Sequence, residues 1–366
     1  MSLIKDIYSP EFYNEFAALA HTVLPDFDAE RFVEKCLSPS FKNMEWKQRM
    51  QHTTAVLHDF LPVNFAEATP LLLKLVDQLT VENFGVDSLV FMFLPDYISA
   101  YGLMDFNNST KLLERFTMFV SCEFAVRPFL IKYPEEMMEV MLVFSEHQNY
   151  KVRRFASEGS RPRLPWAMAI PSLKKNPAPL IPLLENLMND PSEWVRRSVA
   201  NNLNDISKDH PDVVIDIAKR WLGVNKETDA IIKHGCRTLL KQGHVEVLGV
   251  YGLSNEGIEV LDFEIQTPVV RFGESVEFKC LIRNNTGASK VVRLEYGLYY
   301  QKANGQLNRK VFKISEKIYD AAMTGVIFRK QSFKAITTRV YHPGAHAVSI
   351  IINGVEIHKL PFELRR

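Results

Sequence analysis

The chain has 366 residues, of which 46% are hydrophobic and 24% charged, and its formal net charge is +1 at pH 7. This length allows two domains with separate cores, and the composition is ordinary for a soluble globular protein and gives no sign of disorder. The four cysteines (Cys36, Cys122, Cys236 and Cys280) form no Cys-x-x-Cys pair, which argues against a zinc site and a disulfide framework. We therefore expect a protein of the reducing cytoplasm that uses no metal and no cofactor.

Charge is distributed unevenly along the chain. Residues 1–120 contain 9 Lys+Arg against 16 Asp+Glu, residues 121–260 contain 18 of each, and residues 261–366 contain 17 against 9. The basic last third indicates either a polyanionic partner or an ordinary basic surface, and the sequence favours neither. No segment approaches the roughly 18 apolar residues of a membrane span, so no membrane association is expected.

Residues 1–256 are predicted to form short helices in pairs. Apolar residues recur three and four positions apart in segments 9–24, 42–61, 65–79 and 109–126, between breaks rich in Pro, Asn and Asp. The sequence YKVRRFASE from Tyr150 is echoed by EWVRRSVANNL from Glu193, with Val152 and Val195 43 residues apart, and AIIKHGCRTLL follows. Periods near 40 residues are typical of HEAT-like repeats, so this region is predicted to be an α-solenoid.

Residues 257–366 are predicted to form an all-β domain. Apolar and polar residues alternate in segments 260–267, 275–285, 290–301, 309–318 and 346–354, while Asn304-Gly305 and Asn353-Gly354 are tight-turn pairs. A domain of about 100 residues with this pattern is expected to be an immunoglobulin-like sandwich. Because Cys280 has no partner for a disulfide between the sheets, the sandwich must rely on its apolar core.

A basic stretch at residues 149–167 contains a single acid, Glu158. Equivalent helices of a solenoid present equivalent residues in a row, so this stretch and its echoes predict a basic track along the DNA backbone. The alternative is that the arginines cap helix ends or bridge adjacent repeats, which is the stronger explanation for any one of them. The row as a whole favours DNA, because no acids alternate with it. The DNA-binding candidates are Arg153, Arg154, Arg161, Arg163, Arg196, Arg197, Lys233 and Arg237.

Three acids belong to the same repeats: Glu123, Glu158 and Asp205. A carboxylate near DNA phosphates either neutralises an arginine or stabilises a cation that develops during a reaction, and the residues alone favour the arginine pairing. Glu158 is expected at the end of its helix, before Gly159, where the helix dipole disfavours an anion. Trp166 and Trp194 fit a core position better than a functional one, although Trp166 lies in a polar loop with two prolines.

Several motifs resemble the DNA alkylation repair glycosylases of the AlkC/AlkD superfamily. They are FLPDYISAYG, SCEFAVRPFL, VRRFASEGSRPRLPWA and DPSEWVRRSVANNLNDISKDHPD, and the similarity spans essentially the whole chain. The motif YHPGAHAVSIIING near the end is similar to the immunoglobulin-like domain that the AlkC branch adds to its HEAT-like repeats. The resemblance is therefore to the AlkC branch.

The resemblance implies a monofunctional DNA glycosylase for small cationic lesions, chiefly 3-methyladenine and 3-methylcytosine, that works without base flipping. It places Glu158 and Asp205 at the catalytic carboxylate positions and Trp166 beside the lesion, with Glu123 as a weaker match. The arginines would hold the backbone of double-stranded DNA containing the alkylated base. We accordingly expect a bacterial, monomeric, cytoplasmic protein that is nucleoid-associated when it is on DNA.

A different class of function also fits the fold. HEAT-like repeats are more often scaffolds than enzymes, so a non-catalytic adaptor that binds DNA or a protein is the alternative. The basic domain at residues 257–366 is expected either to clamp the duplex or to cover the last apolar face of the repeats.

Overall fold

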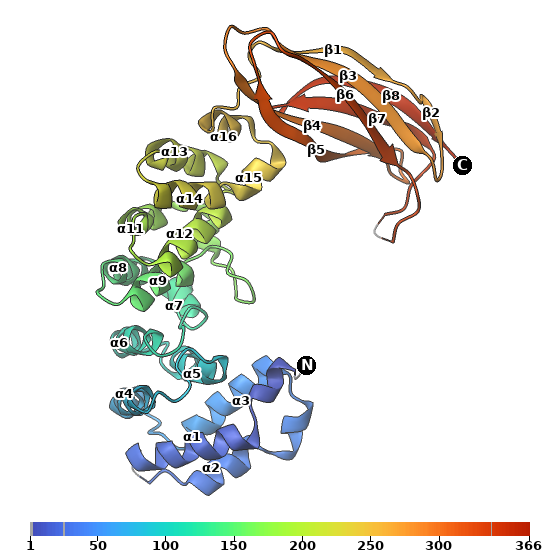
Figure 1. Ribbon diagram of the computed structural model, residues 1–366. Helices are drawn as coiled ribbons and strands as arrows, with labels where there is room; N and C mark the ends of the chain where they lie inside the picture. The colour runs from blue at the N-terminus through green and yellow to red at the C-terminus, as the bar shows by residue number, and fades with distance from the viewer. Residues whose placement is uncertain (1–2, 25, 338) are drawn as a thin grey trace. The chain divides into compact units, whose positions relative to one another are not determined.

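The computed structural model describes residues 3–24, 26–337 and 339–366. It divides into two compact units (Figure 1): residues 1–214 with 221–235, and residues 215–220 with 236–366. The last two helices therefore group with the strands. The first strand starts at Ile258, next to the predicted domain boundary after residue 256.

The first half of the helical region is built from short helices joined by brief loops. Its elements are η1 (Ile4–Ile7), α1 (Pro10–Val23), α2 (Ala29–Cys36), η2 (Pro39–Asn43), α3 (Trp46–His58), α4 (Phe65–Val81), η3 (Leu89–Met92), α5 (Phe93–Tyr101), α6 (Phe106–Thr117) and α7 (Arg127–Lys132).

The second half continues the same pattern. Its elements are α8 (Pro134–Ser145), α9 (Tyr150–Gly159), α10 (Pro171–Lys175), η4 (Ala178–Leu180), α11 (Ile181–Leu187), α12 (Glu193–Ile206), α13 (Pro211–Trp221), α14 (Lys226–Gly235), α15 (Arg237–Gln242) and α16 (Val245–Val250).

Successive helices of the first unit form two layers. In Figure 1, α4, α6, α8 and α11 lie in one layer, and α5, α9 and α12 lie in the other. Helix α12 packs against both α9 and α14, and the repeated residues Val152 and Val195 are both fully buried. The repeat valines thus form the apolar face that neighbouring helices bury in each other, which confirms the predicted helical-repeat architecture.

Local sequence explains where helix α9 begins and ends. The side chain of Asn149 accepts a hydrogen bond from the Lys151 backbone amide at the start of α9, and Asn is a favoured N-cap residue. Helix α9 ends at Gly159 as expected, so Glu158 lies in its last turn. A Cβ at Gly159 would approach Val126 within 2.8 Å, so this position requires a residue without one.

The described residues of the all-β region form eight strands in two sheets. The three-stranded sheet has the order β1-β3-β6 and the five-stranded sheet has the order β2-β8-β7-β4-β5. Within the ranges described, these strands pair antiparallel except for β2 with β8, which are parallel. The strands are β1 (Ile258–Ile265), β2 (Val269–Arg271), β3 (Ser275–Asn284), β4 (Lys290–Gln301), β5 (Leu307–Tyr319), β6 (Thr324–Ser332), β7 (Gly344–Ile352) and β8 (Val355–Arg365).

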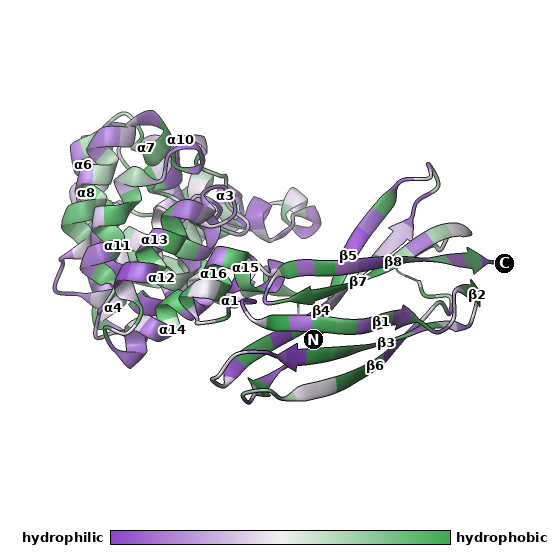
Figure 2. Ribbon diagram, turned by 90° about the horizontal axis from the view of Figure 1, so that it is seen from above, coloured by the Kyte–Doolittle hydropathy of each residue, from purple (hydrophilic) through white to green (hydrophobic). Residues whose placement is uncertain are grey.

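The core of this domain lies between the sheets, as the alternating pattern predicts. Hydrophobic and hydrophilic residues alternate along several strands (Figure 2), and Phe278, Leu298 and Ile350 are fully buried. Asn353 and Gly354 have φ of 47° and 81°, which suits the two-residue turn between β7 and β8. Cys280 is a buried free thiol, so the core forms without a disulfide.

Candidate functional site

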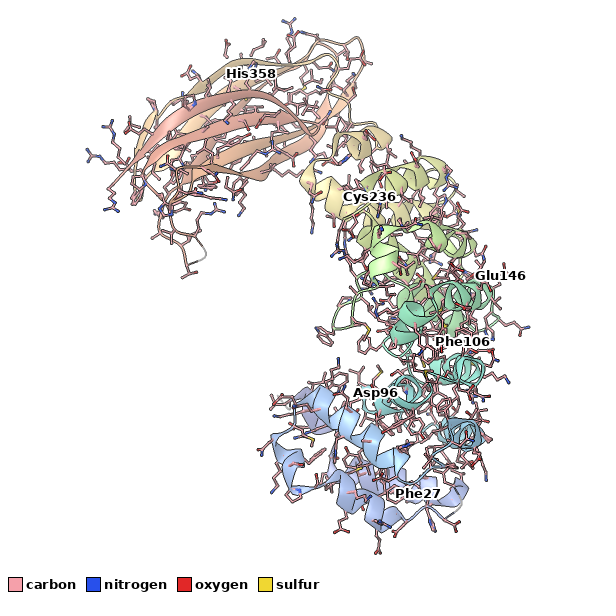
Figure 3. All side chains as sticks on the ribbon, turned by 180° about the vertical axis from the view of Figure 1, so that it is seen from behind. Phe27, Asp96, Phe106, Glu146, Cys236 and His358 are labelled. Atoms are coloured by element: carbon pink, nitrogen blue, oxygen red, sulfur yellow. The ribbon has the colours of Figure 1, made fainter. Side chains whose placement is uncertain are left out.

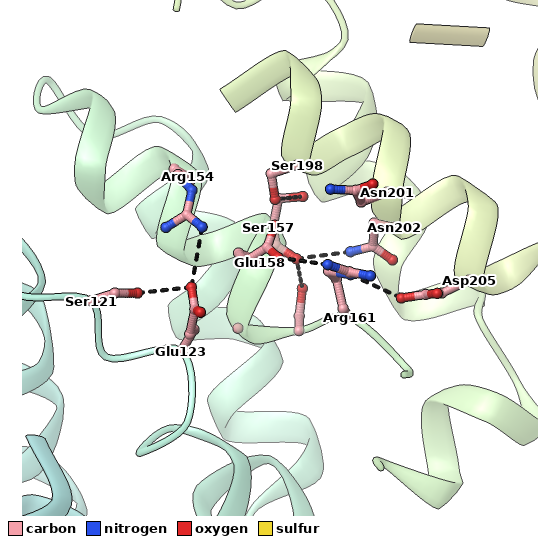
Figure 4. Close-up of polar contacts among 12 residues, drawn as sticks. Ser121, Glu123, Arg154, Ser157, Glu158, Arg161, Ser198, Asn201, Asn202 and Asp205 are labelled. Atoms are coloured by element: carbon pink, nitrogen blue, oxygen red, sulfur yellow. Dashed lines mark hydrogen bonds and ion pairs between the residues drawn. The ribbon is translucent and has the colours of Figure 1, made fainter. Parts of the chain in front are cut away.

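Two acids from adjacent repeats meet on one arginine at the junction of α9 and α12 (Figure 4). Arg161 follows α9, and its Nη1 lies 2.6 Å from Glu158 Oε1 while its Nε lies 2.8 Å from Asp205 Oδ2. Glu158 is only 6% exposed and Asp205 only 2%. The site is thus a buried cation between two buried carboxylates.

The charges in this cluster stabilise one another against burial. Burial lowers the pKa of Arg161, but Glu158 and Asp205 together outweigh burial and leave the pKa raised. Lys208 adds a second cation, with its Nζ 2.9 Å from Asp205 Oδ1. Because each buried acid has a cationic partner, the cluster satisfies the requirement that buried charges be paired.

The two carboxylates differ in the oxygens they leave available. Both oxygens of Asp205 accept hydrogen bonds, one from Arg161 and one from Lys208. Glu158 accepts only at Oε1, and its Oε2 receives no hydrogen bond from any residue that the structure describes. Glu158 is therefore better placed to contact a ligand directly, whereas Asp205 holds Arg161 and Lys208 in position.

The third candidate acid lies in the loop before α7. Glu123 Oε2 accepts from the Ser121 hydroxyl at 2.8 Å and from Arg154 Nη2 at 3.2 Å, as Figure 4 shows. Its Oε1 receives no hydrogen bond within the described ranges. Glu123 and Glu158 thus share the property of one paired and one open oxygen.

A fully buried arginine that sequence reasoning missed supports the site. Arg127 Nη1 donates to the Gly159 carbonyl at 3.0 Å and its Nε donates to the Met168 carbonyl, so it ties α7 to the end of α9 and to the following loop. Burial, and then the neighbouring Arg161, lower the pKa of Arg127 to about 10, although nearby acids oppose the shift. An arginine inside the apolar run FAVRPFL was the available signal.

Buried hydroxyl and amide groups fix α9 against α12. Ser198 donates to the Ser157 hydroxyl at 3.0 Å, and Asn202 Nδ2 donates to the Ser157 carbonyl at 2.9 Å. Both contacts are buried, where hydrogen bonds hold two packed surfaces in one register. They fix the spacing between the helices that carry Glu158 and Asp205.

Comparisons with known proteins give the same architecture. The family model described as "Uncharacterised protein YhaZ, C-terminal Ig-like domain" matches residues 259–366, and the HEAT repeat model matches residues 180–210. The uncharacterised protein YhaZ of Bacillus subtilis is 42% identical over the full length of both chains. The alkylpurine DNA glycosylase AlkC of Pseudomonas fluorescens, solved bound to DNA containing an abasic site analog, is 33% identical over 100% of both chains, with a TM-score of 0.84.

The chain belongs to the AlkC branch of the AlkC/AlkD superfamily of DNA glycosylases. This confirms the resemblance drawn from its motifs, and the immunoglobulin-like domain confirms the choice of branch.

Trp166 of this AlkC-branch chain is not a core residue. Its side chain is 82% exposed, and its φ of 64° is uncommon for a residue other than glycine. Trp194, at 63% exposure, also lies outside the core. The sequence-based preference for core positions was wrong for both tryptophans. Trp166 lies in a loop that Arg127 ties to α7, and Trp194 lies in the first turn of α12 with its side chain exposed.

Four of the arginines pair with acids, and each has one acidic partner 31 to 46 residues away in the sequence. Arg153 pairs with Asp190 at 2.6 Å, Arg154 with Glu123, Arg161 with Glu158 and Asp205, and Arg163 with Asp209 at 2.6 Å. The sequence-based inference that these arginines lack bridging acids was therefore wrong. The stretch itself contains one acid, but neighbouring repeats supply the others. The assignment of these arginines to DNA stays a prediction.

The remaining cations of the predicted track differ in their surroundings. Arg196 Nη1 donates to the carbonyls of Asp190 and Pro191 at 2.7 and 2.9 Å. Arg197 and Lys233 are exposed and have no hydrogen bond or ion pair with any part of the chain that the structure describes. Arg237 begins α15, in the second compact unit, so its alignment with the others stays a prediction.

The described residues contain neither a candidate metal centre nor a candidate membrane-spanning helix. Among the described residues, no group of three or more His, Cys, Asp or Glu side chains is arranged to hold a metal ion. Within the same ranges, no helix combines the length and the apolar character that crossing a membrane demands.

Proposed function

We propose that this protein is a monofunctional DNA glycosylase that hydrolyses the N-glycosidic bond of cationic alkylated bases, 3-methyladenine and 3-methylcytosine, without base flipping. The observation that carries the proposal is the pair of buried carboxylates, Glu158 and Asp205, held by Arg161, with the exposed Trp166 in the loop that follows this arginine. The full-length likeness to AlkC, itself solved on DNA containing an abasic site analog, supports DNA as the partner.

The reaction needs negative charge rather than an acid. As the bond between C1′ and the base nitrogen lengthens, positive charge develops on the sugar, and a fixed carboxylate lowers the barrier by opposing that charge. A methylated base is already cationic, so it leaves as a neutral molecule with the bonding electron pair and needs no proton. Water then adds to C1′ and gives up a proton to a carboxylate.

The oxygens that remain open suggest a division of these tasks. Glu158 presents Oε2 to the sugar and the water, while Asp205 holds Arg161 and so positions Glu158. Glu123 also has one open oxygen, and its other oxygen accepts from Arg154 of α9. It is the candidate to orient the water or to assist Glu158.

Trp166 is suited to contact the lesion nucleotide. Its ring is exposed, its loop is tied to α7 by Arg127, and a cation over an indole face is attracted by the ring. The left-handed backbone at this residue fits a side chain held in one orientation for a ligand, since strained conformations cluster at functional sites.

The DNA backbone would be held by cations that do not already bind acids or carbonyls of the protein. Arg197 and Lys233 meet this condition most clearly, and the paired arginines Arg153 and Arg163 meet it least. We include the basic domain as a clamp that neutralises further phosphates, with Lys302 and Lys330 exposed on it. His346 is no part of that surface, because it is buried in β7. The protein would act as a monomer in the bacterial cytoplasm, on the nucleoid.

Release of bases from methylated DNA tests the proposal. Incubation with the full chain should release 3-methyladenine well above the spontaneous rate, while the abasic strand stays uncut, as for a monofunctional enzyme. If the protein binds the DNA but releases no base, the glycosylase proposal is wrong and the non-catalytic adaptor function takes its place.

Selectivity tests the chemistry separately. A site without a proton donor should act only on leaving groups that already carry charge, so uracil and hypoxanthine should not be released from duplex DNA. Measurable single-turnover release of either neutral base would require a general acid and would contradict this mechanism.

A further inference from the structure

Arg127, the first residue of α7, holds both ends of the backbone segment 159–168, which we call the clamped segment. Its Nη1 donates to the Gly159 carbonyl at 3.0 Å and its Nε donates to the Met168 carbonyl. Gly159 is the last residue of α9, where carbonyls lack partners within the helix and the helix dipole favours a cation. One rigid guanidinium therefore joins two carbonyls, which the single ammonium group of a lysine does not do in the same geometry.

The clamped segment positions two side chains that the proposed reaction uses. Glu158 directly precedes the first carbonyl that is held, and Trp166 lies two residues before the second. The Ile170 amide donates to the Pro162 carbonyl at 3.2 Å, so the loop is also closed at its base. A displacement of Arg127 would therefore reach the carboxylate and the tryptophan together.

A charged side chain at this position is costly for the fold. Arg127 is 0% exposed, both acceptors that it reaches among the described residues are backbone carbonyls, and its Nη2 meets none. Burial, and then the neighbouring Arg161, lower the pKa of Arg127 to about 10. An apolar residue would pack here at less cost, and a buried polar group left unsatisfied in a native protein calls for an explanation such as a role in catalysis.

Three acids of the site offset part of this cost without contacting the arginine. Asp205, Glu123 and Glu158 each act to raise the pKa of Arg127, against the larger effects of burial and Arg161. The attraction is mutual, so the charge of Arg127 also favours the ionised carboxylates that oppose a developing positive charge. Arg127 is thus connected to the site by charge as well as by hydrogen bonds.

We propose that Arg127 is a positioning residue for base excision, which holds the carboxylate of Glu158 and the ring of Trp166 in one arrangement relative to each other. It contacts neither the DNA nor the reacting atoms, because it is fully buried. Its role in excision rests on the proposed function, whereas its control of the clamped segment does not depend on catalysis. Loss of the clamp slows bond cleavage and leaves the cations that bind phosphates in place.

The variant Arg127→Lys tests the proposal in the full chain, because it keeps the charge and removes the two-point clamp. Single-turnover excision of 3-methyladenine should fall at least about tenfold, since misplacement of a reacting group by about 1 Å can cost about a hundredfold. Affinity for a duplex that contains an abasic-site analogue should stay that of the unaltered chain. An unchanged rate of excision, or a fall explained entirely by weaker DNA binding, would overturn the proposal.

The matched control is Arg49→Lys. Arg49 of α3 is 8% exposed and donates through the same two nitrogens, Nε and Nη1, to the carbonyls of Met44 and Lys5 at 3.2 and 2.8 Å. In Figure 3, α3 belongs to the blue helices around Phe27, whereas Glu146 marks the part of the same unit just before α9. This control should lose a similar amount of unfolding free energy and keep normal excision. Equal losses of excision in target and control would mean a merely structural role and would overturn the proposal.

A spectroscopic readout tests the clamp without DNA and without turnover. The full chain is labelled with fluorotryptophan, and the fluorine resonance of Trp166 is assigned by its absence from Trp166→Phe. Arg127→Lys should shift or broaden this resonance, and Arg49→Lys should leave it as in the unaltered chain. An unchanged resonance in Arg127→Lys would overturn the proposal. A displaced resonance in a chain that excises no base would keep the clamp and lose the proposed function.

A double variant shows whether Arg127 acts through Glu158. Excision by Arg127→Lys combined with Glu158→Gln is compared with excision by each single variant. A residue that positions a carboxylate has less left to position once the carboxylate is gone, so the combined loss should be smaller than the product of the two separate losses. A combined loss equal to that product would assign Arg127 an effect independent of Glu158 and would contradict the positioning role.

Discussion

The equivalent helices α9 and α12 carry the same Val-Arg-Arg sequence, but only the first arginine of the pair has equivalent backbone partners in both helices. The first arginine of each pair donates to the two carbonyls five and six residues before it: Arg153 to Gln148 and His147, and Arg196 to Pro191 and Asp190. This shared geometry closes the loop that precedes each helix. The first arginine is therefore a structural element of the repeat.

The second arginine is the variable position. Arg154 reaches Glu123 at 3.2 Å, whereas Arg197 is exposed and unpaired among the described residues. The difference shows that a repeated motif contains one position set by the fold and one available for a ligand. Counting the basic residues of the repeats therefore overestimates the number of cations that are free to bind DNA phosphates.

The acids differ between the two helices as well. Glu158 of α9 corresponds to Asn201 of α12, 43 residues later, and Asn201 accepts a hydrogen bond from His234 instead of pairing with a cation. Asp205 lies one turn beyond that position. The carboxylate pair thus departs from the repeat, which is the pattern expected of residues kept for a specific task rather than for stacking.

The largest effect should follow from removing the cation that joins the two helices. Arg161→Met leaves Glu158 without a partner and Asp205 with Lys208 alone, and breaking a buried ion pair in this way costs about 3–5 kcal/mol of unfolding free energy. Chemical denaturation of the full chain measures the loss.

The control for this variant lies in the same loop. Arg163→Met breaks a partly exposed pair with Asp209 and should cost at most about 1 kcal/mol. Similar losses for Arg161→Met and Arg163→Met would show that the buried cluster contributes nothing particular to stability.

Next in size is the effect on catalysis of neutralising either acid. Glu158→Gln and Asp205→Asn should each keep most DNA affinity and lower single-turnover excision of 3-methyladenine by about a hundredfold or more, the scale of one preorganised electrostatic group. Glu136→Gln, at an exposed acid in the first turn of α8, is the control. Near-normal excision by both target variants would remove these acids from the mechanism.

Much of the fold could be predicted because its signals are local. The spacing of Val152 and Val195 gave the repeat, and the Asn353-Gly354 pair gave a hairpin turn that the backbone angles bear out. The sequence patterns marked five of the eight strands. The patterns missed β2, which has only three residues, and β8, in which Pro361 interrupts the alternation. They also missed β6.

The partners of the site residues could not be predicted in the same way. Arg153 and Asp190 are 37 residues apart, and Arg161 and Asp205 are 44 apart, so their pairing depends on how the repeats stack. Arg127 was overlooked because burial decides its role, and one arginine in an apolar run reveals nothing about its acceptors. Motif resemblance named Glu158 and Asp205, but only the structure distinguishes their oxygens.

A smaller loss of stability should separate the two arginines of α12. Arg196→Gln removes the donor to two backbone carbonyls, which should cost about 1–2 kcal/mol of unfolding free energy. The salt dependence of DNA binding should stay that of the unaltered chain, because this arginine is occupied by the fold. A shallower salt dependence in Arg196→Gln would contradict the structural role.

Replacement of the adjacent Arg197 should instead change DNA binding and have the smallest effect of these variants on unfolding free energy. Arg197→Gln removes an exposed cation without a partner in the described chain, so unfolding free energy should change by less than about 0.5 kcal/mol. If Arg197 contacts one phosphate, the slope of log K against log salt should become shallower by about 0.9. Arg196→Gln, one residue away, is the matched control measured on the same duplex. An unchanged slope in Arg197→Gln would show that the open position of the repeated pair does not serve DNA, and the difference between α9 and α12 would then reflect packing alone.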